Sequence, residues 1–144
     1  MRDTNKIASI ILFILAIITF LIVIDAPMLY SINQNNDCFF AAPSVGSSMY
    51  PTIKNGDNII IMLKTHPEFN LDIGDILVYN HPGIGAVAHR IYNIKGSNYY
   101  VKGDNNEEPD SSSVNMNQII GKVYYTVDKN NILQNFFVEQ FINE

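Results

Sequence analysis

"GAVAHRIYNI", residues 85–94, is the stretch that decides the fold. Alternate residues of a strand point to the same side of a sheet, so Val87, His89 and Ile91 share one face of a predicted strand. A polar ring on an apolar face must find a partner or line a pocket. His89 is therefore either a hydrogen-bonded core histidine or a functional one, and this strand alone leaves both readings open.

Four further runs have the composition of strands: "NIIIMLK" (58–64), "DILVYN" (75–80), "NYYVK" (98–102) and "IIGKVYYTV" (119–127). They are rich in β-branched and aromatic residues, and segments rich in Gly, Asn, Asp and Pro separate them as turns. No amphipathic helix of ordinary length lies between them. The pattern predicts one mainly β domain with antiparallel strands, built as a small barrel or a sandwich-like assembly of coiled sheets.

An uninterrupted apolar run, "IASIILFILAIITFLIVI", occupies Ile7–Ile24. As a helix it would be about 27 Å long, close to the thickness of the hydrocarbon core of a bilayer. A cleaved secretory signal has an apolar core of about 7–15 residues and ends at a small-x-small site, so we expect an uncleaved anchor instead. Arg2 and Lys6 precede the run, and the first basic residue after it is Lys54. The positive-inside rule therefore places the N-terminus in the cytoplasm and the rest of the chain outside.

These features divide the chain into a cytoplasmic N-terminus (1–6), a transmembrane anchor (7–24), a connector (25–42), a β-rich extracytoplasmic domain (43–129) and an amphipathic C-terminal tail (130–144). In the tail, Leu133, Phe137 and Phe141 recur at helical spacing. An apolar face this short can pack on the domain or lie in the headgroup layer, but it cannot span a bilayer.

The composition excludes several classes of function. The net charge is −5 and no cluster of Lys and Arg occurs, which argues against a nucleic-acid partner. The single cysteine, Cys38, excludes an intramolecular disulfide framework and a metal site made of cysteines alone. No Gly-rich phosphate loop is present. We expect neither a cofactor nor a metal.

The segment "SVGSSMYPT", residues 44–52, holds three serines. Such clusters are commonly turns, and a nucleophilic serine would need a neighbouring base that is itself oriented by a partner. His66 and His81 each precede a proline in turn sequence and are expected to be solvated loop residues. His89 is the remaining candidate for the base.

The segment "KGDNNEEPD", residues 102–110, offers two carboxylates, Asp104 and Asp110. Taken alone it is a turn with a solvated acidic face. Together with the serines and His89 it supplies the residue types of a serine hydrolase in the order Ser, His, Asp.

The segments "GSSMYPTIKNGD", "AVAHRI" and "KGDNNEEPD" resemble the three sequence boxes of type I signal peptidases. They are most similar to the archaeal and endoplasmic-reticulum branch, in which histidine followed by arginine stands where the bacterial branch has a lysine base. The resemblance covers about Ile7 to Val127. It implies a β-rich catalytic domain at the membrane surface, acting as a serine endopeptidase that removes signal peptides from secreted preproteins after small residues.

The resemblance also implies roles for individual residues. Ser48 would be the nucleophile, His89 the general base and Asp110 the residue that orients the histidine, with Asp104 as a second acid of the site; the substrate-binding segment would be Val45, Gly46 and Ser47. The family usually has a serine where this chain has Gly46, so a hydroxyl donor to the oxyanion is missing there. The backbone N–H of Ser48 remains available for that purpose.

The implied partners are the signal peptides of preproteins, the lipid bilayer, and the secretion translocon or other signal peptidase subunits. The implied location is the cell membrane, crossed once, or the endoplasmic-reticulum membrane in a eukaryote. Two alternatives stay open: an inactive member of the branch that only binds, and a peptidase dedicated to a few substrates. A metal-dependent hydrolase built on His89, Asp104 and Asp110 lacks a recognised ligand spacing.

Overall fold

The computed structural model describes residues 11–16, 38–132, 134–136 and 138. The chain divides into two compact units, Met1–Asn36 and Asp37–Glu144. In the first unit residues 11–16 are helical. No helix within the described residues is long and apolar enough to cross a membrane. Most of the expected anchor (7–24), the expected cytoplasmic N-terminus and most of the connector lie outside the described residues, so these expectations stay predictions.

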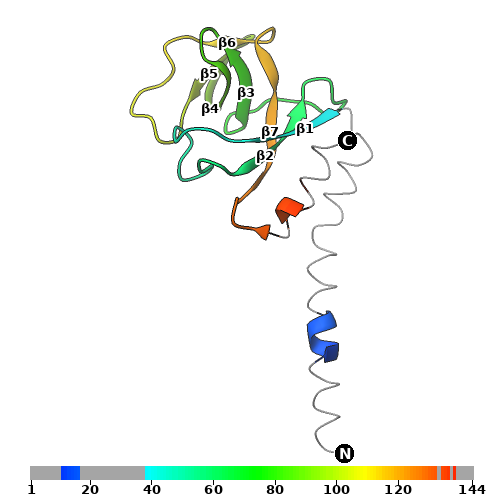
Figure 1. Cartoon of the computed structure of the whole chain (residues 1–144). Coiled ribbons are helices and arrows are strands. Elements are labelled where there is room, and N and C mark those ends of the chain that lie inside the picture. The colour runs from blue at the N-terminus through cyan, green and yellow to red at the C-terminus, as the bar shows by residue number, and fades with distance from the viewer. Residues whose placement is uncertain (1–10, 17–37, 133, 137, 139–144) are drawn as a thin grey trace, which may run out of the picture. The chain divides into compact units, whose positions relative to one another are not determined.

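The second unit is built on one sheet of seven strands (Figure 1). The strands are β1 (Phe39–Pro43), β2 (Asn58–Leu63), β3 (Ile76–His81), β4 (Gly85–Lys95), β5 (Asn98–Lys102), β6 (Val114–Asn115) and β7 (Ile119–Val127). Their order across the sheet is β1-β2-β7-β3-β4-β5-β6, and every neighbouring pair is antiparallel. The prediction of a mainly β, antiparallel domain is confirmed, including all five predicted strands.

Two strands were not predicted. β1 covers the end of the predicted connector (25–42) and the first residue of the predicted domain, Pro43. The pattern did not indicate a strand there, because "FFAAP" contains two alanines and a proline and lacks β-branched residues. β1 pairs only with β2 among the described strands, and proline is tolerated on such an edge. β6 has two residues, too few for a periodic pattern to show.

Three irregularities in register coil the sheet, one each in the β2–β7, β3–β7 and β4–β5 pairings. Extra residues of this kind bend a strand and increase its twist. Two apolar clusters lie on opposite faces of β3, because alternate side chains of a strand point to opposite sides of the sheet. Leu77 and Tyr79 belong to one cluster, and Val78 between them belongs to the other. The described strands thus form an open coiled sheet, with β1 and β6 at its edges, rather than a closed barrel.

The C-terminal tail is helical at residues 132, 134–136 and 138. Val138 is buried, and the Asn135 amide donates to the carbonyl of Asp128 (2.9 Å) and accepts from the Asn58 amide (2.8 Å). The described part of the tail therefore packs on the domain. Leu133, Phe137 and Phe141, which carried the predicted helical spacing, lie outside the described residues.

Candidate active site

Ser48 lies in a loop that connects the edge strand β1 to β2. The base of the loop continues the hairpin, because the Ser44 N–H donates to the Asp57 carbonyl (2.7 Å) and the Gly56 N–H donates to the Ser44 carbonyl (2.9 Å). Further along, Met49 next to Ser48 is buried in the cluster that includes Val78. A buried neighbour and a hydrogen-bonded base hold Ser48 at the surface of the domain in a defined place.

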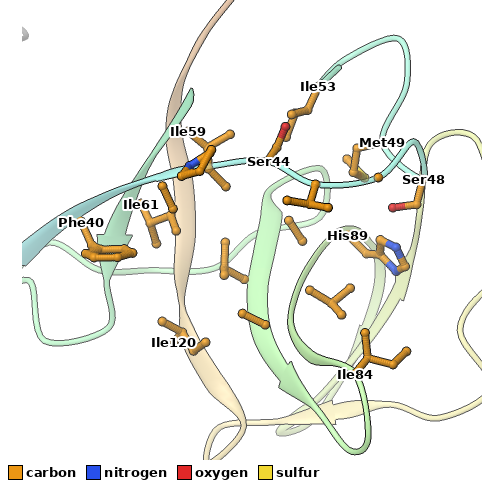
Figure 2. Close-up of a pocket in the computed structure, with 18 of the residues that line it drawn as sticks. Phe40, Ser44, Ser48, Met49, Ile53, Ile59, Ile61, Ile84, His89 and Ile120 are labelled. Atoms are coloured by element: carbon orange, nitrogen blue, oxygen red, sulfur yellow. The ribbon is translucent and has the colours of Figure 1, made fainter. Parts of the chain in front are cut away.

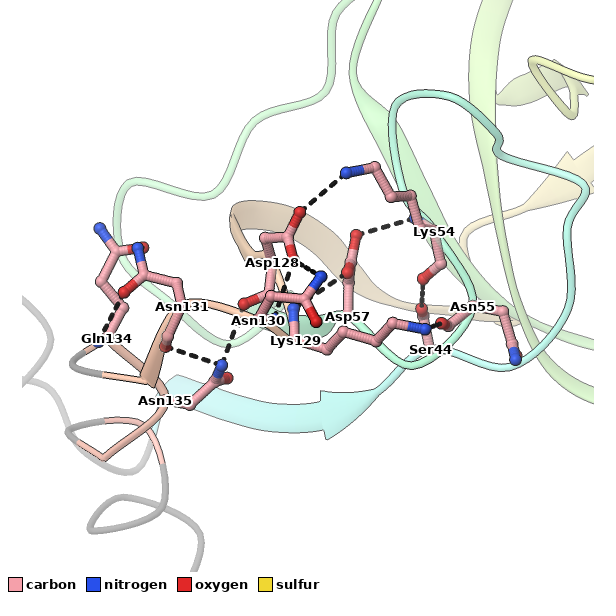
Figure 3. Close-up of polar contacts among 10 residues, drawn as sticks. All are labelled: Ser44, Lys54, Asn55, Asp57, Asp128, Lys129, Asn130, Asn131, Gln134 and Asn135. Carbon is pink, nitrogen blue, oxygen red and sulfur yellow. Dashed lines mark hydrogen bonds and ion pairs between the residues drawn. The ribbon is translucent and has the colours of Figure 1, made fainter.

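Asp57 secures this loop from inside. The residue is 3% exposed, and its carboxylate accepts hydrogen bonds from the backbone N–H of Lys54 (2.8 Å) and the backbone N–H of Lys129 (3.1 Å) (Figure 3). One bond lies within the Ser48 loop and the other follows β7. A buried carboxylate needs such partners, and here they join the loop to the sheet.

His89 lies in the middle of β4, opposite Leu77 of β3. The predicted face is confirmed, since Val87 and Ile91 pack in the same cluster as Leu77. The His89 side chain is 10% exposed, and its Nδ1 lies 2.8 Å from Oδ1 and 3.0 Å from Oδ2 of Asp110. The ring on the apolar face has thus found an acidic partner, and its other nitrogen, Nε2, remains for a second contact.

Asp110 reaches His89 because its loop folds back on β5. The Asp110 N–H donates to the Val101 carbonyl (3.0 Å), which fixes a residue that follows five polar residues and a proline. The side chain of Asp110 is 13% exposed. Its second carboxylate oxygen accepts a hydrogen bond from the hydroxyl of Tyr79, a residue of β3 that is 2% exposed. Burial first, and then the bond to Asp110, raises the pKa of Tyr79, so the phenol stays protonated and acts as a donor.

Asp104 serves different partners. Arg90 donates from Nε and Nη2 to its two oxygens, at 2.9 and 2.7 Å, and the Thr52 hydroxyl donates at 2.5 Å. These bonds, with that from Arg90 the largest cause, hold the pKa of Asp104 below its ordinary value. Arg90 also donates to the Gly74 carbonyl (2.7 Å). The structure therefore brings Asp110 to His89, and uses Asp104 to join the Ser48 loop to β4.

The acidic loop and the Ser48 loop touch at Gly103. The backbone N–H of Asn105 donates to the Ser48 carbonyl (2.8 Å). A Cβ at Gly103 would come within 2.7 Å of that carbonyl oxygen, closer than real Cβ atoms approach, so this contact requires glycine. The glycine of the "KGDNN" segment thus allows two loops far apart in sequence to meet beside Ser48.

Ser48 and His89 both line an apolar pocket of about 500 Å³, and Figure 2 shows them at the same end of it. Ile59, Ile61 and Val78 also line it, and Phe40 of β1 lies at its other end. A serine hydroxyl, an imidazole with an acidic partner and an apolar cleft can together carry out nucleophilic attack on an acyl group.

The expected substrate-binding segment lies on the rim of this pocket. Val45 and Gly46 line it, whereas Ser47 is exposed and is not among the lining residues. Gly46 has a φ of +103°, a conformation that residues with a side chain rarely adopt, so a serine would be strained in this backbone conformation. Within the described residues, the Ser48 N–H donates to no protein acceptor and remains free for an oxyanion.

The prediction that His66 and His81 are solvated loop residues is wrong. His66 is 8% exposed, its Nδ1 accepts the Glu68 N–H (3.1 Å), and its ring packs edge-on against Phe39. His81 is the half-buried last residue of β3. A proline after each histidine does indicate a turn, but it does not reveal that His66 is buried and that His81 is half-buried at a strand end. Neither residue lines the pocket, and the described residues contain no cluster of three or more metal-ligating side chains.

Sequence reasoning missed Tyr79, Thr52 and Asn106, which lines the pocket near Ser48. Tyr79 lies in a strand run where aromatic residues are ordinary, so nothing in the pattern distinguishes a functional hydroxyl. Thr52 and Asn106 do stand within the segments "SVGSSMYPT" and "KGDNNEEPD", which was the available signal.

The family model described as Peptidase S24-like matches residues 15–124, which is most of the chain. The chain belongs to the peptidase S24-like family. The match includes Ser48, His89, Asp104 and Asp110. No curated protein matches the chain.

As a peptidase S24-like protein, the chain carries a serine peptidase domain. The match extends over β1 to β6 and most of β7, together with residues 15–38 before the sheet. It does not distinguish branches within this type of peptidase, so the finer reading depends on the site itself.

Proposed function

We propose that the chain is a membrane-bound signal peptidase, most similar to the archaeal and endoplasmic-reticulum branch, that removes signal peptides after small residues. The observation that carries the proposal is the His89–Asp110 pair at the end of an apolar pocket that Ser48 also lines. A histidine rather than a lysine at this place is what the sequence boxes of that branch lead us to expect.

In the proposed mechanism, Nδ1 of His89 is held by Asp110, so Nε2 takes the proton of the Ser48 hydroxyl. The serine oxygen attacks the scissile carbonyl carbon, and the Ser48 N–H stabilises the negative charge on the carbonyl oxygen. His89 then gives the proton to the leaving amine, and the C–N bond breaks. A water molecule, deprotonated by His89, hydrolyses the acyl-enzyme and frees Ser48.

Two unpaired strand edges support a peptide substrate. The outer edge of β1 has no partner strand within the described residues, and β4 pairs with β5 only from Arg90 onward. The pocket lies between these edges, lined by Ala42 and Pro43 on one side and Ala86 to Ala88 on the other. An extended peptide can bind there as an added strand, with its scissile bond at Ser48 and small side chains directed toward the apolar floor.

The N-terminal apolar run supports the membrane part of the proposal. Preproteins carry their own apolar segment in the bilayer, and an anchor at 7–24 would hold the peptidase beside them. Tethering of this kind raises the effective concentration of a substrate without any new contact. Association with the secretion translocon or other signal peptidase subunits would act in the same way.

The experiment is cleavage of a preprotein by the purified full-length chain in lipid vesicles, with Ser48→Ala and His89→Ala as test variants. We expect both variants to lose at least about 10³-fold in kcat, because removal of a nucleophile or its base leaves only the other elements of the site. His66→Asn is the matched control, since an amide oxygen replaces the buried Nδ1 acceptor outside the pocket. Its rate should stay near normal.

The outcomes separate the readings. Near-normal cleavage by His89→Ala would exclude the proposed base. A parent chain that binds a signal peptide but never cleaves any preprotein would indicate an inactive binding subunit. Cleavage of only a few preproteins from a mixed set would indicate a dedicated peptidase.

A further inference from the structure

Asp110 is held from two sides, and only one side belongs to the serine–histidine chemistry. His89 Nδ1 lies 2.8 Å from Oδ1 and 3.0 Å from Oδ2 of Asp110, and the Tyr79 hydroxyl also donates to Oδ2. The Tyr79 ring also packs edge-on against the His89 ring, with centroids 6.4 Å apart. Tyr79 therefore contacts both members of the pair from inside the domain.

We propose that Tyr79 is a positioning residue, which fixes the rotation of the Asp110 carboxylate and, through it, the orientation of the His89 ring. The inference rests on the proposed role of His89 as the base. It adds a fourth member, behind the acid, to the arrangement of Ser48, His89 and Asp110.

Tyr79 is buried, so its hydroxyl needs a hydrogen-bond partner inside the domain. The residue is 2% exposed, and the other buried members of its cluster are aliphatic, so phenylalanine would fill the space without a polar group. A buried phenol hydroxyl is unfavourable unless it is hydrogen-bonded, and Asp110 is its partner. The register irregularity between Val78 and Tyr79 sits at this residue, where the extra residue of β7 changes the local twist.

The bond also has an electrostatic effect on the pair. A donor to Asp110 stabilises part of the carboxylate charge that faces the His89 ring. Three other ionisable groups lie nearby. His81 is 6.3 Å from Tyr79 between ring centroids, and Asp104 is already matched by Arg90. Loss of the hydroxyl should therefore leave more uncompensated charge beside His89, so His89 should accept its proton at a higher pH.

The test uses Tyr79→Phe in the full-length chain, with nuclear magnetic resonance to follow the titration of each histidine ring. Signals are assigned from variants that lack one histidine. We expect the titration midpoint of His89 to move about one pH unit higher, as loss of a hydrogen bond to a charged group would give. In the cleavage assay we expect kcat to fall about 10-fold with KM unchanged, as for the loss of an outer-shell hydrogen bond, and the acid limb of the pH profile to move the same way.

Tyr99→Phe is the matched control. Tyr99 packs against the same cluster, but its hydroxyl donates to the sulfur of Met116 (3.6 Å), away from the pocket. Its removal should leave the His89 titration and kcat unchanged. A 3-fluorotyrosine at position 79 is a stronger donor of nearly the same size and should move the His89 midpoint to lower pH.

A change in stability at position 79 with no movement of the His89 midpoint in either direction would overturn the proposal and make Tyr79 an ordinary core residue. The titration needs no substrate. If the parent chain cleaves no preprotein, the proposed function fails, and the titration still decides the role of Tyr79.

Discussion

At the scale of the residue, the acidic loop shows how two similar side chains acquire different functions. Asp104 and Asp110 are six positions apart in one polar segment. The Asp104 carboxylate accepts two hydrogen bonds from the Arg90 guanidinium and one from a threonine hydroxyl. The Asp110 carboxylate instead contacts the His89 imidazole and accepts a hydrogen bond from a buried phenol. The first set of partners keeps a carboxylate charged in a fixed structural link, and the second set places a carboxylate where it can orient a base.

This difference predicts opposite outcomes for two conservative substitutions. Asp110→Asn should lose about 10⁴-fold in kcat, because an amide stabilises the wrong tautomer of His89. Asp104→Asn should lose only about 10-fold, because it weakens a link to Arg90 and leaves the His89–Asp110 contact intact. Steady-state cleavage by both purified variants, with circular dichroism to confirm folding, measures the difference. A dead Asp104→Asn beside an active Asp110→Asn would reverse the assignment.

What the sequence could predict at this scale follows from the range of each interaction. The alternation in "GAVAHRIYNI" places His89 on an apolar face because neighbours in one strand decide that. The same pattern cannot identify the partner of the ring, since Asp110 arrives from a loop 21 residues away. The burial of His66 and the role of Tyr79 could not be predicted for the same reason, since their partners, Phe39 and Asp110, lie far away in the sequence.

At the scale of the element, the strands with strong β-branched composition were predictable and the edge strand β1 was not. β1 forms because β2 offers a paired partner from Asn58 to Met62, and its own residues have no pattern of their own. The Ser48 loop is likewise defined by contacts beyond its sequence. Hydrogen bonds at its base, the buried Asp57 and the Asn105 N–H all hold it from other elements.

The contribution of Asp57 to the stability of this loop can be measured with a conservative substitution. In Asp57→Asn, one side-chain oxygen becomes an NH₂ group that faces a backbone N–H, so one buried donor loses its acceptor. We expect the free energy of unfolding to fall by about 1–3 kcal/mol. Urea unfolding of the full-length chain measures the change through its midpoint.

The exposed Asp72→Asn is the control and should stay within about 0.5 kcal/mol of the parent, since it alters a surface carboxylate. An Asp57→Asn variant as stable as the parent would mean that the loop is held without this carboxylate.

At the scale of the whole molecule, the described domain places Ser48 and His89 in an open pocket between two unpaired strand edges, and the family match agrees with a serine peptidase domain. In the proposed function the domain works at a membrane, and the side on which it lies is a prediction of its own. Arg2 and Lys6 precede the apolar run, and the first basic residue after it is Lys54. This distribution of basic residues favours an N-terminus in the cytoplasm and the domain outside.

Cysteine accessibility tests this orientation in intact cells freed of their wall. Cys38 is the only cysteine, so Cys38→Ser gives a background without thiols. Ser97→Cys then places one thiol in the exposed turn between β4 and β5, and Thr4→Cys places one before the apolar run. A maleimide that cannot cross membranes should label Ser97→Cys at once and Thr4→Cys only after the cells are made permeable. The reverse pattern would mean that the domain faces the cytoplasm, where the preproteins of the proposed reaction have not yet exposed their cleavage sites.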